Sequence, residues 1–520
     1  MTTGKDPKIG RFLFESITKG LYDNPLCIFR EYVQNAADAI DEAMKAGALH
    51  RKTDAYISIK IDPSKEEEIV IEDNGCGIPS GEAAEILSSI GDSAKFGGKS
   101  RGFRGIGRLG GMAYCSHLTF RSKARNDKME MINTWDCKKM QLMLNPNNRN
   151  YKGMPLQEVI RECSTFELKP CTRPASNAHF IVGMKGVRSA KDVLKDLVRV
   201  RAYLAEVAPV PFDQQQFPIG KEIDEYLRSE IPSYETYRLM VNDEPVFKPH
   251  RMTVELTQNK SDHISGFDRI EVLDLRDKPI AEGWVARRKD LVGVVQSDGC
   301  DGIRVRVGNI LIGGSRLLSG GFSQPRFNAY FVGELHPVDS ELVPNAQREA
   351  FEDSEVSNIF YEQFEKQIGQ PLSKKVSQAS QSFNRKKVVA KAEYLVKTVK
   401  STIGKGFLGT AHKEKTVKEL RTAETEIEGL LARRKCEEEV KSQAATVREQ
   451  IGSLREQISE QGTGGKLGGT LAETLCDSYS RAEKILVGKV FDHLYSQYEK
   501  TKDATSLAQA ITRRLNSEAR

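Results

Sequence analysis

The sequence predicts an α+β protein in three parts: an α/β sandwich over residues 1–215, a second α/β domain over 216–384, and a helical region over 385–520. The first two parts are predicted because segments with helical periodicity are interleaved with segments in which apolar and polar residues alternate. The third part is predicted by apolar residues that recur at alternating steps of four and three, which is typical of packed helices.

The first part contains one long helical pattern, IFREYVQNAADAIDEAMKAG, which ends at Gly47, a residue type that favours helix C-termini. A second helical pattern covers residues 190–208 and stops at the prolines of PVPF. Four further segments alternate like strands: DAYISIKID (54–62), EEIVIEDNGCG (67–77), CSHLTFRSKA (115–124) and AHFIVGMKG (178–186).

The second part is expected to contain strands over 302–314 and 328–338 and a closing helix over 354–372. In the third part, the apolar seam is formed by Val440, Ala444, Val447, Ile451, Leu454 and Ile458. A glycine-rich stretch, 461–470, interrupts it, and a second helical pattern follows with Leu471, Leu475, Tyr479, Leu486, Val490 and Leu494. We expect these two patterns to form an antiparallel hairpin, which either packs on itself or joins two chains into a dimer.

Composition limits the class of protein. With 39% hydrophobic and 29% charged residues, the chain resembles an ordinary globular protein. No apolar run approaches the roughly 18–20 residues that span a bilayer, and the first residues lack a secretory signal, so we expect a cytoplasmic protein without membrane contact. The nine cysteines are scattered and form no CxxC pair. Zinc and disulfide frameworks are therefore not expected.

The net charge of +6 lies in the tail, where residues 385–520 carry 26 Lys+Arg and 19 Asp+Glu. Two interpretations are open: contact with a nucleic acid or another acidic partner, or a solvated helical surface, which we favour.

One stretch, GFRGIGRLGG (102–111), holds five glycines. Glycine at this density indicates a backbone that approaches another group closely. Residues 105–110 spell GxGxxG, but the dinucleotide fingerprint needs a strand directly before it, and the preceding residues do not form one. The stretch by itself therefore does not favour a dinucleotide-binding loop.

Two polar groups of residues accompany this loop. Glu31, Asn35 and Asp38 fall on one face of the first helix among apolar neighbours, which suggests the lining of a pocket. Asp73 ends an apolar strand and is followed by Gly75 and Gly77. A carboxylate there would accept a hydrogen bond from the exocyclic amine of adenine. Taken alone, however, the stretch favours the alternative, an ordinary Asn-Gly hairpin turn.

Together the motifs ExxxNxxDA (31–39), DxGxG (73–77) and GxxGxG (102–107) resemble the GHKL ATPase superfamily, which includes gyrase B, heat-shock protein 90, histidine kinases and MutL. The first helices, the stretch ILSSIGDSAKFG and the stretch ELVPNAQREAFED are most similar to heat-shock protein 90. The resemblance covers residues 12–120 and 340–352 and implies a Bergerat-fold sandwich that binds ATP.

The resemblance also implies roles for single residues. Glu31 would be the general base, and Arg348 would reach the γ-phosphate from the second domain. Asn35 would coordinate Mg²⁺, Asp73 would hold the adenine amine, and Asp38 would form an ion pair beside the pocket. The remaining nucleotide-binding residues would be Gly75, Gly77, Ile78, Lys95, Gly102, Gly105, Ile106, Gly107 and Arg108. One departure is that Asn177 and Ala178 stand where the family usually has Gly-Thr, so Ser176 is the candidate substitute.

Three functions follow as alternatives. The first is a dimeric clamp of the heat-shock-protein-90 type, which hydrolyses ATP slowly and closes on a protein partner in a chaperone-like way. The second is a MutL- or MORC-like clamp that acts on DNA, favoured by GFRG and by the basic tail. The third is an ATP-binding regulatory subunit with negligible turnover. Neither a nuclease nor a histidine kinase is expected, because the tail lacks a metal-ligand cluster and no phosphoacceptor helix precedes the ATP-binding motifs.

Overall fold

The structure, a computed structural model, divides into two compact units, residues 1–376 and 377–520. It has mixed sheets in the first unit and helices in the second, which confirms the predicted α+β class. The residues that it describes are 24–90, 107–145, 147–151, 154–188, 190–257, 260–296, 299–432, 436–460, 470–498 and 501–518.

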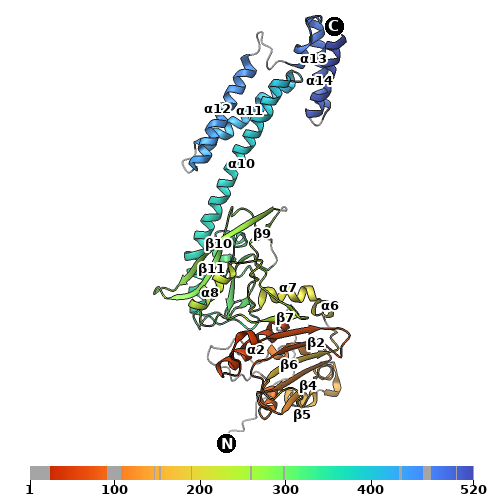
Figure 1. Ribbon diagram of the computed structural model, residues 1–520, viewed down its shortest axis with the longest axis vertical. Coiled ribbons are helices and arrows are strands. Elements are labelled where there is room, and N and C mark those ends of the chain that lie inside the picture. The colour runs from red at the N-terminus through yellow and green to blue at the C-terminus, as the bar shows by residue number, and fades with distance from the viewer. Residues whose placement is uncertain are drawn as a thin grey trace. The chain divides into compact units, whose positions relative to one another are not determined.

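Among the described residues, eight strands form the first sheet, in the order β5-β4-β3-β6-β2-β1-β7-β8 (Figure 1). All neighbours are antiparallel except β1 and β7. Two strands of this sheet, β7 and β8, therefore come from the part of the chain after residue 215. The domain boundary at residue 215 stays a prediction. The strands are β1 (Ile57–Ile61), β2 (Glu67–Asp73), β3 (His117–Lys123), β4 (Met129–Asp136), β5 (Ser164–Pro170), β6 (His179–Lys185), β7 (Leu239–Val241) and β8 (Glu244–Pro245).

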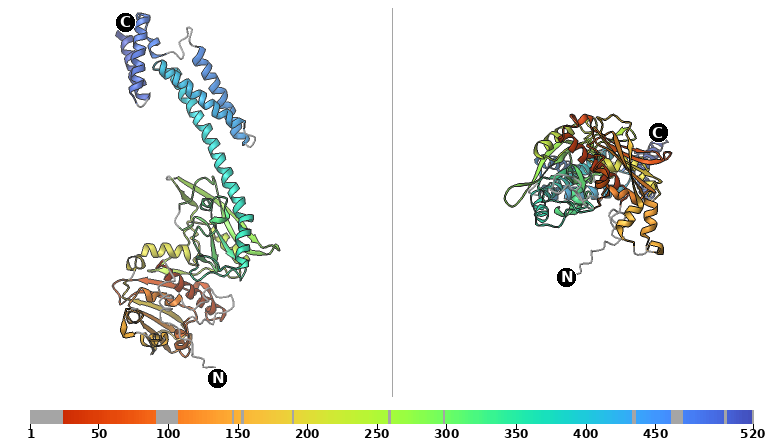
Figure 2. Two further views of the ribbon diagram at one scale, coloured as in Figure 1. Left: turned by 180° about the vertical axis from the view of Figure 1, so that it is seen from behind. Right: turned by 90° about the horizontal axis from the view of Figure 1, so that it is seen from below.

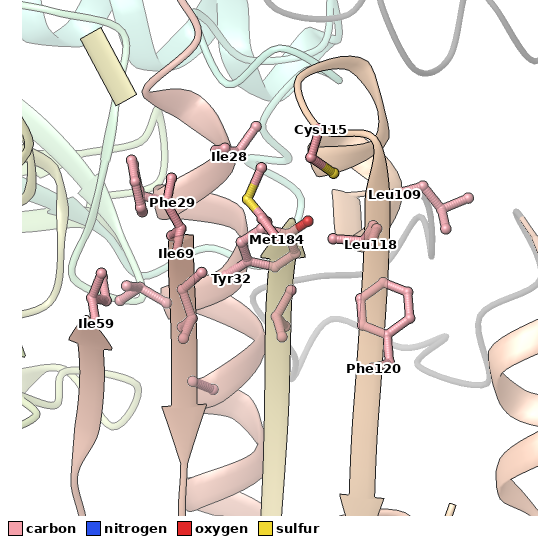
Figure 3. Close-up of a cluster of buried hydrophobic side chains, with 14 of the residues drawn as sticks. Ile28, Phe29, Tyr32, Ile59, Ile69, Leu109, Cys115, Leu118, Phe120 and Met184 are labelled. Atoms are coloured by element: carbon pink, nitrogen blue, oxygen red, sulfur yellow. The ribbon is translucent and has the colours of Figure 1, made fainter. Parts of the chain in front are cut away.

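Helix α2 (Cys27–Lys45) covers one face of this sheet. Figure 3 shows Ile28, Phe29 and Tyr32 of α2 lying over side chains from β1, β2, β6 and β3, and all of these are buried. The helix ends as predicted, because Gly47 adopts φ +68° and its amide donates to the carbonyl of Met44. Four short helices lie in the same unit: α3 (Ala83–Ser88), α4 (Cys137–Leu144), α5 (Leu156–Cys163) and α6 (Lys191–Leu194).

The prediction of a single helix over 190–208 is wrong. The structure has two helices there, α6 and α7 (Leu197–Val207). The side chain of Asp196 accepts hydrogen bonds from the amides of Val198 and Arg199. Asp196 therefore starts a new helix, because a capping carboxylate satisfies amides that have no partner inside a helix.

The second sheet contains six strands in the described ranges, in the order β13-β12-β14-β11-β10-β9. The strands expected over 302–314 form the hairpin β12–β13, and the strand expected over 328–338 is β14. The predicted closing helix is α9 (Glu355–Phe364), which continues through a π-helical turn into α10 (Gln370–Lys405). The bounds are β9 (Thr253–Leu256), β10 (Lys260–Leu273), β11 (Pro279–Arg288), β12 (Gly302–Val307), β13 (Ile310–Ile312), β14 (Val332–Pro337) and α8 (Gly220–Glu230).

A fully buried group of charges connects this second sheet to the end of α7. Glu334 lies 2.7 Å from Nζ of Lys248 and 2.6 Å from Nε of Arg306. Arg306 also donates to the carbonyl oxygens of Glu206 and Ala208 at the end of α7. A guanidinium is favourable there because the last carbonyls of a helix lack partners within the helix.

His250 lies beside this charged group, in a cage of aromatic rings. Its ring centroid is 5.2 Å from that of Phe212, 5.5 Å from that of Phe217 and 5.4 Å from that of Trp284. Neither ring nitrogen has a hydrogen-bond partner among the described residues. Burial lowers the pKa of His250 to about 3, because a charged imidazole is disfavoured away from water.

We expect His250→Phe to raise the free energy of unfolding by about 1–3 kcal/mol, because it removes a buried polar group without a partner and keeps the ring packing. The pH dependence should also flatten. The unfolded chain protonates His250 near pH 6.5 and the folded chain only near pH 3, so the wild type loses stability as the pH falls between these values. Denaturant titrations at pH 7.5 and 5 would measure both effects.

The matched control is His263→Phe, because His263 is exposed on a strand of the same sheet. It should change the stability little and leave the slope with pH intact. A His250→Phe protein that is less stable at pH 5 than the wild type would contradict the prediction.

In the second unit, the predicted apolar seam is buried, but its partner differs from the one expected. All six seam residues lie on α12 (Glu438–Glu460) and pack with α10 and α11 (Thr410–Leu431) in one cluster. Figure 2 shows α11 and α12 lying alongside α10. The expected hairpin between 440–458 and 471–494 is therefore wrong, because α11 supplies the apolar face instead.

The second apolar pattern belongs to another small cluster. Leu471 and Phe491 pack there with Ala504 and Ala508, on α13 (Arg481–Gln497), α14 (Thr501–Glu518) and the 3₁₀ helix Leu471–Thr474. Leu486 and Val490, which were expected on the packed face, are 63% and 48% exposed.

Within the described residues, no helix is both long and apolar enough to cross a membrane.

Candidate functional site

The carboxylate of Glu31 is the point at which three predicted site residues meet. Glu31 lies on α2 and is buried, with Oε1 3.3 Å from Nη2 of Arg30 and 3.9 Å from Nε of Arg348. A Cβ on Gly107 would lie 2.4 Å from Oε2 of Glu31. A side chain at position 107 would therefore displace this carboxylate from its present place.

A tyrosine that the motifs did not single out holds this arrangement. The hydroxyl of Tyr32 donates to the carbonyl of Arg108 and accepts from the amide of Gly111, at 3.0 and 3.1 Å. It therefore ties the 3₁₀ helix Gly107–Ala113 to α2. Burial raises the pKa of Tyr32 well above its usual value, so its hydroxyl stays protonated and can donate. Aromatic residues on helices are so common in cores that only the contact reveals this role.

The side chain of Arg108 points to another partner. Its Nη2 donates to the carbonyl oxygens of Ile86 and Ser89 at the end of α3. Arg108 therefore anchors the 3₁₀ helix to α3. Its predicted contribution to phosphate binding stays a prediction.

Asp73 lies at the end of β2 and is buried. Its Oδ1 accepts a hydrogen bond from the amide of Gly75 at 2.9 Å. The loop then packs directly on α2, because a Cβ on Gly75 would lie 2.6 Å from the carbonyl carbon of Ala39 and the amide of Cys76 donates to the Ala39 carbonyl. The second motif thus meets the helix that carries the first.

Position 77 requires glycine for two reasons. Its φ is +62°, and a Cβ would lie 2.2 Å from the carbonyl oxygen of Lys123. The next amide, of Ile78, donates to Oγ of Ser122 at 2.7 Å. This loop leads from β2 toward α3 and β2 pairs with β1 and β6, so the alternative of an Asn-Gly hairpin turn is wrong.

Asn35 and Asp38 lie on α2, one and two turns after Glu31. Asn35 is half-buried, whereas Asp38 is only 4% exposed. Their predicted roles in holding Mg²⁺ and lining the pocket stay predictions. Four predicted residues fall outside the described part of the chain: Lys95, Gly102, Gly105 and Ile106.

Arg348 reaches Glu31 from a tight turn of the second α/β region. Its φ is +57°, a conformation that a non-glycine residue adopts only when its surroundings demand it. The amide of Arg348 donates to the carbonyl of Asn345, and its own carbonyl accepts from Gly313. Arg30 of α2 donates to the carbonyl of Gln347 at 3.2 Å, so this turn is held against the helix.

Lys123 organises the stretch in which the sequence departs from the family pattern. Its buried ammonium donates to the carbonyl oxygens of Pro174, Ala175 and Asn177, at 3.2, 3.2 and 2.5 Å. These contacts fix the loop that leads into β6, next to Ala178. No spacing in the sequence points to this lysine, because its partners are backbone atoms.

Comparisons with known proteins find matches in the part of the chain that contains Glu31 and Asp73. Residues 29–168 match the family described as "Histidine kinase-, DNA gyrase B-, and HSP90-like ATPase". The chaperone protein HtpG of Acinetobacter baylyi is 35% identical over 85 residues, which are 16% of this chain and 13% of that protein. The chaperone protein HtpG of Polaromonas sp. strain JS666 is 30% identical over 128 residues, 21% of this chain and 20% of that protein.

The chain thus spans a fifth or less of the length of these two relatives. The matched family segment contains the helix with Glu31, the loop after Asp73 and the 3₁₀ helix that begins at Gly107. Residues 29–168 therefore form an ATPase domain of the histidine kinase, DNA gyrase B and HSP90 family.

Proposed function

We propose that this protein is a Mg²⁺-dependent ATPase of the heat-shock-protein-90 type, in which ATP controls the closure of a dimeric clamp on a protein partner. The observation that carries the proposal is the meeting of separate motifs on α2. Glu31 lies against Gly107 and within 3.9 Å of Arg348, and the loop after Asp73 packs on Ala39. Residues more than 300 positions apart thus share one location.

The residues present suit a nucleoside triphosphate with its metal. Asp73 offers a buried acceptor for an exocyclic amine. The backbone amides of the loop that ends at Gly107 would cradle the phosphate oxygens. The amide oxygen of Asn35 is a ligand type that Mg²⁺ accepts, and the ion would neutralise charge between the phosphates. Glu31 would orient and polarise the attacking water as general base.

Arg348 supplies the coupling between the two α/β regions in this proposal. In the structure its guanidinium lies beside Glu31, and we infer that it contacts the γ-phosphate when ATP is bound. Hydrolysis would then require the turn at 345–350 to stay docked on α2. The state of the nucleotide would thereby control the arrangement of the second region.

We expect Arg348→Ala to slow hydrolysis on the order of 10³-fold, because an arginine that stabilises the transferring phosphoryl group contributes about that much. Affinity for ADP, which lacks the γ-phosphate, should stay unchanged. Steady-state phosphate release and calorimetry with ADP would measure the two quantities. Arg316→Ala is the matched control, because Arg316 is exposed in the same region; a normal rate in Arg348→Ala would exclude the docking model.

The proposal is tested most directly by three measurements on the full chain. ATP hydrolysis should require Mg²⁺ and stop when EDTA is added. The mass in solution should correspond to a dimer, and a non-hydrolysable ATP analogue should compact it. No hydrolysis with nucleotide binding intact would leave the regulatory-subunit interpretation, and a monomer under both conditions would exclude the clamp.

A DNA-binding clamp is the second candidate, because the helical region is basic whereas the rest of the chain carries slightly more acidic than basic residues. Duplex DNA should then stimulate hydrolysis at low salt, and the stimulation should fade as salt rises, since phosphate contacts release counterions. Hydrolysis that DNA does not change at either salt concentration would favour a protein partner.

A further inference from the structure

Three side chains with metal-binding chemistry meet at one end of the first sheet. They are Glu130 of β4, Cys171 just after β5 and His179, the first residue of β6. One potential ligand atom of each, a carboxylate oxygen, the thiol sulfur and a ring nitrogen, lies within 4.8 Å of the other two. A search of the described residues for three or more His, Cys, Asp or Glu side chains that could hold a metal ion finds this one group.

The order of the strands brings these residues together. β5, β4, β3 and β6 are consecutive neighbours, and Figure 1 shows β4, β5 and β6 in this part of the sheet. His179 pairs with Lys123 at the end of β3, and the amide of Cys171 donates to the carbonyl of Lys128, just before β4. The three ligand candidates therefore share one end of the sheet although they are up to 49 residues apart.

This group lies on the sheet face opposite the candidate nucleotide site. Successive side chains of a strand alternate between the two faces. Met184 of β6 packs in the core with α2, so His179, five residues earlier, points to the other face. Glu72 lies on that same face, where it forms an ion pair with Arg173 at 2.7 Å, while its neighbour Asp73 lies on the face of α2.

The imidazole is both buried and incompletely bonded. His179 is 1% exposed, and its Nε2 lies 2.6 Å from Oε1 of Glu130. Its Nδ1 has no hydrogen-bond partner among the described residues. Buried polar atoms nearly always have partners. The unpartnered Nδ1 therefore points to a missing ligand, because the same imidazole contacts Glu130 through Nε2 and lies near the thiol of Cys171.

We propose that Glu130, Cys171 and His179 bind one Zn²⁺ ion, with water as the fourth ligand. Sulfur, imidazole nitrogen and carboxylate oxygen are the donors that Zn²⁺ uses in proteins. Tetrahedral bonds of about 2.0–2.3 Å place ligand atoms roughly 3.3–3.8 Å apart. The three candidate ligand atoms already lie within 4.8 Å of one another. Binding releases the thiol proton of Cys171 to solvent, and the thiolate and carboxylate then balance the charge of the ion.

The ion would link the two ends of the loop between Cys171 and His179 and so restrict its conformations. Lys123 already holds this loop through backbone carbonyl oxygens. The scattered cysteines did not suggest such a site, because only one thiol takes part and the other ligands come from different strands. The site rests on no part of the proposed ATPase function.

The test uses the full chain, prepared free of metal and titrated with Co²⁺ in place of Zn²⁺. One equivalent should produce a thiolate-to-cobalt charge-transfer band, and Zn²⁺ should abolish it. Cys171→Ser should remove the band, and Glu130→Gln should weaken the affinity for Co²⁺ by at least about 10-fold, because a neutral amide replaces a carboxylate ligand. Cys476→Ser, which replaces a half-buried free thiol in the other unit, should leave the band unchanged.

A second measurement does not depend on variants. Zn²⁺ should slow the alkylation of Cys171 in the wild-type protein and leave that of Cys476 unchanged, as followed by mass spectrometry. The absence of a charge-transfer band in the wild type, an unchanged band in Cys171→Ser, or equal alkylation rates of Cys171 with and without Zn²⁺ would each overturn the proposal. No nucleotide enters either measurement, so the result is separate from the test of ATP hydrolysis.

Discussion

Asp73→Asn is expected to reduce the affinity for ATP and ADP by about 10–10²-fold, because a hydrogen bond to a buried charged group contributes roughly 1.5–3 kcal/mol. The substitution keeps the shape of the side chain, and an amide oxygen can still accept the hydrogen bond from Gly75. The loop should therefore keep its conformation, while an amide offers the adenine amine a weaker acceptor or a second donor. Calorimetric titration with both nucleotides measures the loss.

The neighbouring Glu72→Gln is the matched control. Glu72 lies on the same strand, but its carboxylate pairs with Arg173 on the opposite face of the sheet. It should leave nucleotide affinity unchanged. Undiminished affinity in Asp73→Asn would refute the adenine contact, and an equal loss in both variants would indicate a general disturbance of β2.

Glu31→Gln is expected to abolish turnover, with a loss of about 10²–10⁴-fold, and to leave ATP binding largely intact. A general base contributes about this much to a reaction. Glutamine keeps the length of the side chain beside Gly107 but cannot take up a proton. Single-turnover phosphate release measures the chemical step, and binding of a non-hydrolysable ATP analogue measures affinity.

Glu42→Gln is the control on the same helix, because Glu42 is an exposed carboxylate of α2. Its turnover should match that of the wild type. A Glu31→Gln protein that no longer binds ATP would contradict the role of Glu31 as base and would assign it to binding.

Much of the local structure could be predicted because it depends on neighbouring residues. The strand pattern of ISIKI is encoded by alternation, and the end of α2 is encoded by Gly47, which follows its last residue, Lys45; both occur as expected. The apolar seam of α12 was predicted for the same reason, since its members repeat along one helix. The break at Asp196 was missed because a single capping side chain overrode an otherwise continuous pattern.

Contacts between distant segments required the tertiary structure. The seam identified an apolar face but not its partner, because several helices offer similar faces, and α11 covers it. The motifs predict that Glu31, Asp73 and the glycine loop at 102–107 converge. They carry no information on the hydroxyl of Tyr32 or the ammonium of Lys123, whose partners include backbone atoms.

The sequence by itself determined the fold class, the helix that carries Glu31 and the glycine loops whose chemistry pointed to a nucleotide, because periodicity and residue type are local properties. Only the tertiary structure decided that Arg30 holds the turn with Arg348 against α2, and that Cys171, His179 and Glu130 meet on the opposite face of the sheet. Strand order and the docking of one region on another bring these side chains together, and no spacing along the chain records either.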